Sequence, residues 1–372
     1  MTDSLDAQND SRALEEGLAP LREQIDGLDR ELVELLNRRA EVVVEVGKLK
    51  RDKGGAIYAP DREQRVLERV RALNEGRLLP DTCIEAIWRE MMSGSFALER
   101  PLRIGYLGPP GTFSHLAARR KFGASVEYDN LADIPLIFEA VDRGDIDYGL
   151  VPIENSTEGF VTPSLDGLMN TRSRVCAEVL LPIHNNLLAN CDAPDIKVIY
   201  SHPQPLAQCR RWLSAQFPQV PRVATTSTSK AAEQAAEEPG AAAIGTTLAA
   251  QIYGLAIQFE NIEDSGENTT RFYVMARQET GPTGDDKTAI YFTTKHRSGA
   301  LADVLDVFRD EGINLTHIDK RPSQRKNWDY VFFVDLLGHI SDPHVSKALS
   351  EAAEHCLELR VLGSFPRATQ PL

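Results

Sequence analysis

Arg39 interrupts a row of apolar residues that would otherwise face a partner helix. Between residues 21 and 53, apolar side chains recur alternately four and three positions apart, and Arg39 occupies a position where this alternation places another apolar residue. Lys50 follows about three helical turns later and shares the face of Arg39, roughly 16 Å along the axis. Because a charge in a packed row is costly unless it is paired, the pattern predicts either a buried charge that fixes helix register or a cavity that binds an anion.

Other polar residues are expected near the same helical core. Arg22 is turned about a quarter-circle from the row, at about 100° per residue, and is expected to face a different cavity. Ser95 and Glu99 extend an apolar row on a later helical pattern, and Arg62 and Glu63 open the pattern before it. Each alone is typical of a surface ion pair, but several around one core favour an anion-binding cavity.

Three helical patterns must position these side chains. They are expected over residues 21–53, 61–74 and 81–99. Pro20 suits the first turn of the long helix, the glycines at 54 and 55 end it, and Pro101 closes the segment. We therefore expect residues 12–100 to form one all-helical domain, preceded by a polar, mobile tail.

The strings LREQIDGLDRELVELLNRRAEVVVEVGKLK, DRE and IWREMMSGSFALE resemble the all-helical chorismate mutase family across residues 20 to 99. The resemblance implies an intertwined homodimer in which the long helix supplies one arginine to the partner's site. It also implies that Arg22, Arg39 and Arg62 bind the substrate carboxylates, that Glu63 binds the ring hydroxyl, and that Lys50 contacts the ether oxygen.

Rearrangement of chorismate needs no nucleophile and no proton transfer. It needs a compact conformer and compensation of the negative charge that develops on the ether oxygen, which fixed arginine and lysine donors supply. Glu99 stands where some family members carry a glutamine that donates to this oxygen. A carboxylate cannot donate, so we expect Glu99 to act protonated and the mutase to favour lower pH. Ala59 replaces an aspartate of some members and leaves a main-chain contact at most.

A second polar constellation follows the strand pattern RIGYLG and runs GPPGTFSHLAA. Gly108 and Gly111 permit close main-chain approach, and Thr112 or Ser114 can cap a helix whose free N–H groups face an anion. A dinucleotide site is the rival interpretation, but the spacing is not GxGxxG and two prolines remove N–H donors. Small-carboxylate binding is favoured, and a capped helix without a ligand remains open.

Three further polar strings, VPIENSTEG, SHPQPLAQC and ENTTRFYV, end strands or begin helices, where α/β folds bind ligands. Each alone is compatible with turn chemistry. Together with GPPGTFSH they resemble prephenate dehydratase over residues 102–278, which implies a two-lobed α/β fold like that of periplasmic binding proteins, with the site in the cleft. The residues that the resemblance places in the pocket are Thr112, Ser114, Glu154, Asn155, Ser156, Ser201, His202, Gln208, Thr270 and Arg271.

Prephenate loses CO2 and hydroxide as its ring becomes aromatic. Aromatisation supplies a large driving force, so a weak acid that is hydrogen-bonded to the departing hydroxyl suffices. The family's essential threonine falls on Thr270, which we expect to be that donor. Glu154 and His202 are stronger acids and remain alternatives.

After a linker, QETGPTGDDK, the patterns run strand, helix, strand, strand, helix, strand over residues 286–364, the order of a ferredoxin-like α+β sandwich. SGALADV and HIDKRPSQ resemble the GALV and ESRP motifs of amino-acid-binding ACT domains, although Asp319 and Lys320 replace the Glu-Ser of the second. The resemblance implies phenylalanine binding at a dimer interface with feedback inhibition, through Gly299, Ala300, Leu301, Arg321 and Pro322.

Composition limits the alternatives. The net charge of −14 argues against nucleic-acid or anionic-membrane partners, and no apolar run approaches the ~18 residues that span a bilayer. Five scattered cysteines without a CxxC pair suit reduced thiols in the cytoplasm, and the eight histidines show no metal-ligand spacing. We expect no metal and no cofactor.

Two other functions remain open. A non-enzymatic ligand sensor explains the clefts but not the gathering of Arg39, Lys50 and Arg62. A mutase joined to a prephenate dehydrogenase needs a proper dinucleotide fingerprint. The favoured interpretation is a bifunctional chorismate mutase/prephenate dehydratase with an ACT domain.

Overall fold

The computed structural model describes residues 2–52, 58–322 and 330–372, and for residues 2–13, 16, 50–52 and 99 it describes the main chain alone. The chain forms two units. One comprises residues up to 57 together with 95–100, and the other comprises 58–94 with 101–372.

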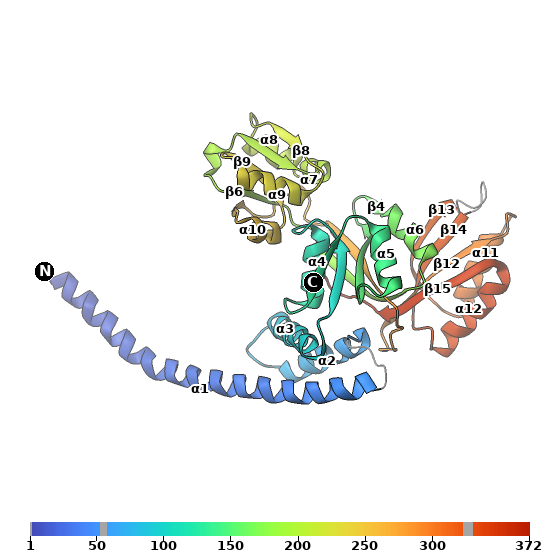
Figure 1. The fold of residues 1–372 in the computed structure, drawn as a ribbon, viewed down its shortest axis with the longest axis horizontal. Coiled ribbons are helices and arrows are strands. Elements are labelled where there is room, and N and C mark those ends of the chain that lie inside the picture. Colours follow the sequence, from blue (N-terminus) through green and yellow to red (C-terminus); the bar gives the residue numbers. More distant parts are fainter. Residues whose placement is uncertain (1, 53–57, 323–329) are drawn as a thin grey trace. The chain divides into compact units, whose positions relative to one another are not determined.

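Helix α1 runs without a break from Thr2 to Asp52 (Figure 1). The prediction that it begins at Pro20, after a mobile tail, is wrong, because the proline lies inside the helix. Proline removes one hydrogen bond from a helix interior, but the preceding string SRALEEGLA is rich in good helix formers that continue the helix backward. The predicted apolar row remains exposed along α1, and Leu28 and Leu32 are 59% and 55% exposed.

Two shorter helices follow, α2 (Pro60–Asn74) and α3 (Asp81–Glu99), as the sequence predicts. Pro60 occupies the first turn of α2, where its missing N–H costs nothing. The buried side of α2 includes Leu67 and Val70.

The first α/β lobe is built on a sheet of order β2-β1-β3-β11-β5, with β4 added beside β3. Its strands are β1 (Arg103–Leu107), β2 (Glu127–Leu131), β3 (Tyr148–Asn155), β4 (Gly159–Phe160), β5 (Arg174–Pro182) and β11 (Thr269–Ala276). Its helices are α4 (Phe113–Phe122), α5 (Ile134–Arg143) and α6 (Thr162–Asn170). β1 pairs in parallel with β2 and β3, whereas β11 is antiparallel to both β3 and β5.

The second lobe, yellow-green in Figure 1, has its own sheet of order β10-β6-β9-β7-β8. Its strands are β6 (Asn186–Ala189), β7 (Val198–Ser201), β8 (Arg222–Ala224), β9 (Ala241–Gly245) and β10 (Ala256–Phe259). Its helices are η1 (Ala193–Asp195), α7 (Pro203–Gln208), α8 (Arg210–Gln216), α9 (Thr228–Glu237) and α10 (Thr247–Tyr253). The string VCAEVLLPIHNNLLA crosses from the first lobe to the second as β5 and β6. A return crossing between β10 and β11 was not predicted.

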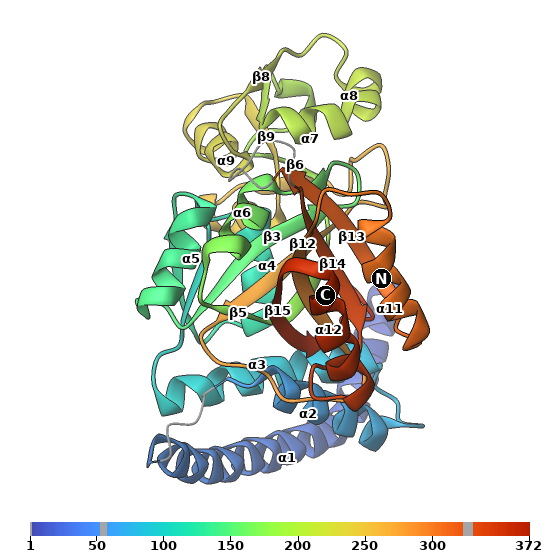
Figure 2. The same cartoon turned by 90° about the vertical axis from the view of Figure 1, so that its right-hand side faces the viewer.

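The C-terminal domain faces the viewer in Figure 2 and has the predicted βαββαβ order. Its elements are β12 (Asp286–Thr294), α11 (Ala300–Asp310), β13 (Leu315–Pro322), β14 (Tyr330–Leu337), α12 (Pro343–His355) and β15 (Cys356–Pro366). The antiparallel sheet has the order β13-β14-β12-β15. One face packs on α11 and α12 through Phe292 and Phe308, whereas Tyr291 and Phe333 on the other face join the core of the first lobe.

Candidate active sites

A cavity of about 290 Å³ lies between the two α/β lobes. Six of the ten residues that the resemblance places in the pocket line it, namely Thr112, Ser114, Asn155, His202, Gln208 and Thr270. They come from strand ends and helix starts of both lobes, so the fold brings together four strings that are far apart in the chain.

Thr112 and Ser114 stand at the start of α4. The Thr112 hydroxyl caps this helix by accepting a hydrogen bond from the main-chain N–H of His115, and it donates to the carbonyl of Leu107 at 3.0 Å. Ser114 follows in the first turn and is 7% exposed. The free N–H groups of this turn give the cleft a partial positive charge that suits an anion.

His115 supports the loop that precedes α4. Its Nδ1 accepts a hydrogen bond from the N–H of Gly111 at 3.1 Å, and its ring stacks on Tyr106 with centroids 4.4 Å apart. Burial, and to a lesser extent the charge of Arg119, lowers the pKa of His115 to about 4. The imidazole is therefore neutral at pH 7 and able to act as an acceptor.

Asn155 and Thr270 form the floor of the cleft. The Asn155 side-chain amide donates to the Thr270 hydroxyl at 2.9 Å and to Asn268 Oδ1 at 2.8 Å. Its own carbonyl oxygen accepts from the N–H of Thr157 at 3.0 Å, so the amide is fixed in one orientation. Since the Thr270 oxygen already accepts a hydrogen bond, its proton is free to be donated to a ligand.

The wall contributed by the second lobe includes residues that the sequence analysis missed. Thr226, Ser227 and Thr228 line the cavity at the start of α9, where the Ser227 hydroxyl caps the helix by accepting from the N–H of Lys230 at 3.0 Å. The signal was the string TTSTS after a short strand, which has the same strand-end and cap pattern as the other clusters. His202 caps α7 through Nδ1, which accepts from the N–H of Gln204 at 3.4 Å.

Ser156 and Ser201 lie outside the cavity lining. The Ser201 hydroxyl is fully buried and donates to the carbonyl of Ile244 at 2.9 Å, which ties β7 to β9. Ser156 accepts from the N–H of Thr269 at 3.0 Å and donates to the carbonyl of Glu267 at 3.2 Å. Both hydroxyls therefore brace main chain near the cleft.

Arg271 and Glu154, which were also expected in the pocket, are not among the residues that line this cavity. Successive residues of a strand face opposite sides of a sheet. With Thr270 toward the cleft, Arg271 points to the C-terminal domain, where its guanidinium forms an ion pair with Asp335 and lies 3.7 Å from Glu178. Glu154, its cross-strand neighbour, lies 3.4 Å from the Arg271 Nε.

The cluster around Arg271 is buried. Arg271 is 8% exposed, Asp335 3% and Glu178 4%. Tyr273 donates its hydroxyl proton to Asp335 at 2.7 Å, and Lys287 lies 3.0 Å from Glu178. Arg271 and Lys287 thus balance the charges of Asp335 and Glu178, and both carboxylates depend on these cations.

Within the first unit, Arg39 and Ser95 come together. The Arg39 guanidinium donates to the Ser95 hydroxyl at 3.2 Å, and both side chains are half-buried. Arg22 is exposed on α1. The side chains of Lys50 and Glu99 lie outside the described residues.

Arg62 and Glu63 belong to the second unit. Arg62 is exposed in the first turn of α2, and Glu63 is 7% exposed. The Glu63 carboxylate accepts from the Tyr58 hydroxyl at 2.7 Å and from the Lys121 ammonium of α4 at 2.7 Å. Burial, then the charge of Glu63, holds the pKa of Tyr58 well above its usual value, so its phenol remains a donor.

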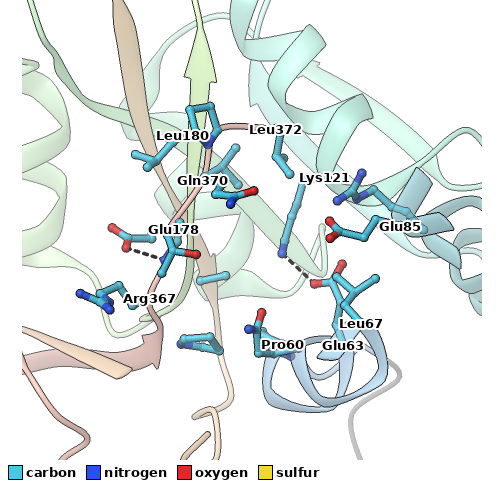
Figure 3. Close-up of a pocket in the computed structure, with 18 of the residues that line it drawn as sticks. Pro60, Glu63, Leu67, Glu85, Lys121, Glu178, Leu180, Arg367, Gln370 and Leu372 are labelled. Carbon is cyan, nitrogen blue, oxygen red and sulfur yellow. Dashed lines mark hydrogen bonds and ion pairs between the residues drawn. The ribbon is translucent and has the colours of Figure 1, made fainter. Parts of the chain in front are cut away.

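Glu63 and Lys121 line a second cavity, of about 230 Å³, between α2, residues 81–94 of α3, the first lobe and the C-terminal residues 366–372 (Figure 3). Lys121 points toward Glu63 in this view, and Arg71 pairs with Glu85 on the same lining. The first ion pair joins α2 to α4 of the first lobe, and the second joins α2 to α3.

In the C-terminal domain, Gly299 precedes α11 with a φ of 80°, a left-handed conformation that favours glycine. Ala300, buried, and Leu301, half-buried, begin the helix. Arg321, near the end of β13 before Pro322, donates to the carbonyl of Thr162 at 2.7 Å. It also lies 3.2 Å from Asp166 of α6.

Among the residues that the structure describes, no group of three or more His, Cys, Asp or Glu side chains is arranged to hold a metal ion. No helix in the described part is both long and apolar enough to span a bilayer.

Three family models match successive parts of the chain. They are chorismate mutase type II over residues 21–100, prephenate dehydratase over 104–280 and the ACT domain over 288–354. Among solved structures, a prephenate dehydratase from Arthrobacter aurescens in complex with L-Phe is 34% identical, with a TM-score of 0.67, and the match covers 73% of this chain and 92% of that one. The prephenate dehydratase of Staphylococcus aureus is 29% identical with a TM-score of 0.63, over 71% and 100%.

Curated relatives match nearly the whole chain. The bifunctional chorismate mutase/prephenate dehydratase of Aquifex aeolicus is 42% identical over 95% of this chain and 99% of its own length. The protein of the same description from Escherichia coli is 34% identical over 95% and 97%. This chain therefore belongs to the family of bifunctional chorismate mutase/prephenate dehydratases.

Proposed function

We propose that the helical segment rearranges chorismate to prephenate and that the cleft between the α/β lobes converts prephenate to phenylpyruvate, with phenylalanine as the feedback inhibitor. The observation that carries the dehydratase assignment is the hydrogen bond from Asn155 to the Thr270 hydroxyl in the polar cavity.

Thr270 serves as the donor to the departing hydroxyl. The Asn155 amide N–H donates a hydrogen bond to the Thr270 oxygen, and this bond directs the hydroxyl proton toward the ligand. As the C–O bond breaks, the electron pair of the C–CO2 bond enters the ring, CO2 leaves, and the departing hydroxide takes up a proton to form water. Glu154 faces the C-terminal domain, so His202 is the remaining alternative acid.

Two helix starts are suited to the carboxylates of prephenate. Thr112 and Ser114 stand at the N-terminus of α4 in one lobe, and Thr226 to Thr228 stand at the N-terminus of α9 in the other. The free main-chain N–H groups at both helix starts offer hydrogen bonds to an anion without a side-chain charge.

In the mutase, Arg39 binds a substrate carboxylate, and its hydrogen bond to Ser95 supports its orientation. Arg22 and Arg62 bind the remaining carboxylate oxygens, and Lys50 contacts the ether oxygen. Glu63 meets the ring hydroxyl, for which its carboxylate must release Tyr58 or Lys121. Protonated Glu99 supplies a second donor to the ether oxygen. These roles extend the family resemblance and rest on position in the sequence.

The proposed assembly is a homodimer. Its support is the apolar row of α1, which includes Leu28 and Leu32 and stays exposed in the single chain. A helix with such a row gains most by packing lengthwise on a second helix. A second copy would also bring Arg22 of one chain to the site of the other.

Phenylalanine is proposed to bind the C-terminal domain at Gly299, Ala300 and Leu301 with Arg321 and Pro322. The support is the similarity to the ACT domain and to a dehydratase solved with L-Phe. The ion pair between Arg271 and Asp335 offers the contact through which this domain acts on β11, the strand of Thr270. The described cysteines are free thiols, in keeping with a cytoplasmic location.

One assay tests both activities. The purified chain is supplied with chorismate and no NAD, and phenylpyruvate should accumulate after prephenate. Replacing Thr270 with valine should stop the sequence at prephenate. Absence of phenylpyruvate from the parent protein would refute the proposal, as would full dehydratase turnover by the valine variant.

A further inference from the structure

Two buried polar atoms beside the cleft have no hydrogen-bond partner. They are Nε2 of Gln208, a residue that lines the cavity, and Oδ1 of Asn185. Buried polar atoms are nearly always satisfied, so each exception calls for a physical reason. An amide N–H group that is directed at a ligand site is satisfied when the ligand arrives.

Asn185 lies where the chain first crosses from one lobe to the other, and it is fully buried. Its N–H donates to the carboxylate of Glu263 at 2.9 Å, and its carbonyl accepts from the N–H of Ile262 at 2.8 Å. Both partners belong to the return crossing. The two crossing segments therefore hold Asn185 in place from both sides.

The Asn185 side chain contacts one end of the Gln208 amide. Asn185 Nδ2 donates to Gln208 Oε1 at 3.3 Å, which occupies the acceptor end of that amide. The Gln208 carbonyl also accepts from the N–H of Asp264 at 2.7 Å, so its main chain is anchored to the same crossing. The donor end of the Gln208 amide has no hydrogen-bond partner among the described residues.

We propose that Gln208 binds a carboxylate oxygen of prephenate through Nε2 and that Asn185 is the positioning residue that keeps this donor directed at the substrate. The proposal deepens the dehydratase function and rests on it. A reversed amide would present an oxygen to the substrate carboxylate and repel it. Because the bond is made to the bound substrate, its loss raises KM more than it lowers kcat.

The test compares two neighbouring buried asparagines. Asn185→Leu should raise KM for prephenate by about 10- to 100-fold, the loss expected for a hydrogen bond to a charged group, with kcat within about threefold of the parent. Asn186→Leu is the control, because Asn186 is 2% exposed but bonds to main-chain groups, among them the carbonyl of Gly245 and the N–H of Asn261. It should lower the melting temperature without a comparable change in KM.

A double-mutant cycle separates positioning from general damage. Gln208→Leu should raise KM as Asn185→Leu does, and the double variant should be no worse than Gln208→Leu alone. Additive effects would mean that Asn185 does not act through Gln208 and would overturn the proposal.

A pH series adds a measurement that a purely structural role of Asn185 would leave unchanged. In Asn185→Asp, the introduced carboxyl can donate to Gln208 only while it is protonated. Once ionised it accepts, and the Gln208 amide turns its oxygen to the cleft. KM should therefore rise with pH in this variant relative to the parent, and parallel KM profiles would count against the proposal. Lack of turnover by the parent would instead refute the dehydratase function, whereas parent turnover with an unchanged KM in Asn185→Leu would refute this inference alone.

Discussion

Thr270 and Arg271 are adjacent in β11 and serve opposite sides of its sheet. Thr270 meets Asn155 in the cleft, and Arg271 forms its ion pair with Asp335 of the C-terminal domain. A displacement of this strand therefore reaches a proposed catalytic hydroxyl and an interdomain contact at once.

Removing the Thr270 hydroxyl tests its proposed role as the proton donor in the cleft. Thr270→Val keeps the shape of the side chain, and it should lower dehydratase kcat by about 10²- to 10⁴-fold, the usual contribution of a positioned proton donor. Thr270→Ser keeps the hydroxyl and should retain most of the activity. The mutase turnover of the same preparations, measured as the loss of chorismate, serves as the internal control. Equal dehydratase kcat values for the two variants would contradict the assignment.

Removing the Arg271 charge tests how much the buried cluster on the other side of the sheet stabilises the fold. Arg271→Met leaves Asp335 and Glu178 buried with too little positive charge, and it should lower the free energy of unfolding by about 3–5 kcal/mol. Urea unfolding measures this loss. Arg143→Met is the matched control, because Arg143 is 59% exposed and its pairs with Glu139 and Asp145 are worth about 0–1 kcal/mol. Similar losses of unfolding free energy in the two variants would show that the buried cluster stabilises the fold no more than an exposed ion pair does.

Asp335→Asn should weaken inhibition by phenylalanine. The asparagine keeps the size of the side chain, but it removes the charge and keeps only one of the two oxygens that accept from Tyr273 and Arg271. Dehydratase rates measured across a phenylalanine titration should show a higher half-inhibitory concentration, with phenylalanine binding itself followed by calorimetry. Unchanged inhibition would exclude this contact as the route between the domains.

The fold should lose stability in mild acid through His115. Its pKa in the folded protein is about 4, below the usual 6.5, so folding favours the neutral ring. The stabilisation is complete above pH 6.5 and is lost as the pH falls toward 4, up to about 3 kcal/mol. His115→Gln cannot titrate and can still accept from the N–H of Gly111. Melting temperatures from pH 7 to pH 4 should fall more steeply for the parent, and parallel curves would contradict the expectation.

The exposed row on α1 predicts a dimer that the mutase needs. Leu28→Glu together with Leu32→Glu should shift sedimentation toward a monomer and abolish chorismate turnover, while added prephenate is still converted. Arg30→Glu alters the opposite face of the helix and should leave the dimer intact. A double glutamate variant that stays dimeric would remove the support that α1 gives to this assembly.

The secondary structure of the C-terminal domain could be predicted because each strand and helix carries its own local pattern. The start of α1 was misplaced because Pro20 is a helix-start signal, and the helix formers before it outweighed that signal. Thr270 and Arg271 share one motif, and strand alternation requires them to face apart. Which of them faces the cleft depends on the position of β11 between β3 and β5, which is information from the whole sheet.

The pairing of Asn185 with Gln208 could not be predicted for a different reason. It joins Asn185, in a crossing segment without a motif, to Gln208, and the string SHPQPLAQC that contains Gln208 does not indicate this partner. Thr226 to Thr228 did carry the strand-end and cap signal. They were missed because hydroxyl-rich strings are common at ordinary helix starts.

The order of the first sheet also affects how the protein is made. β11 lies between β3 and β5, yet it is synthesised only after the entire second lobe. Until the ribosome has added it, β3 and β5 each have an unpaired edge in the middle of the sheet, a form that readily joins other chains. A nascent chain arrested within the second lobe should therefore depend on chaperones, and the second lobe, whose strands are contiguous, should be the first of the two α/β lobes to fold.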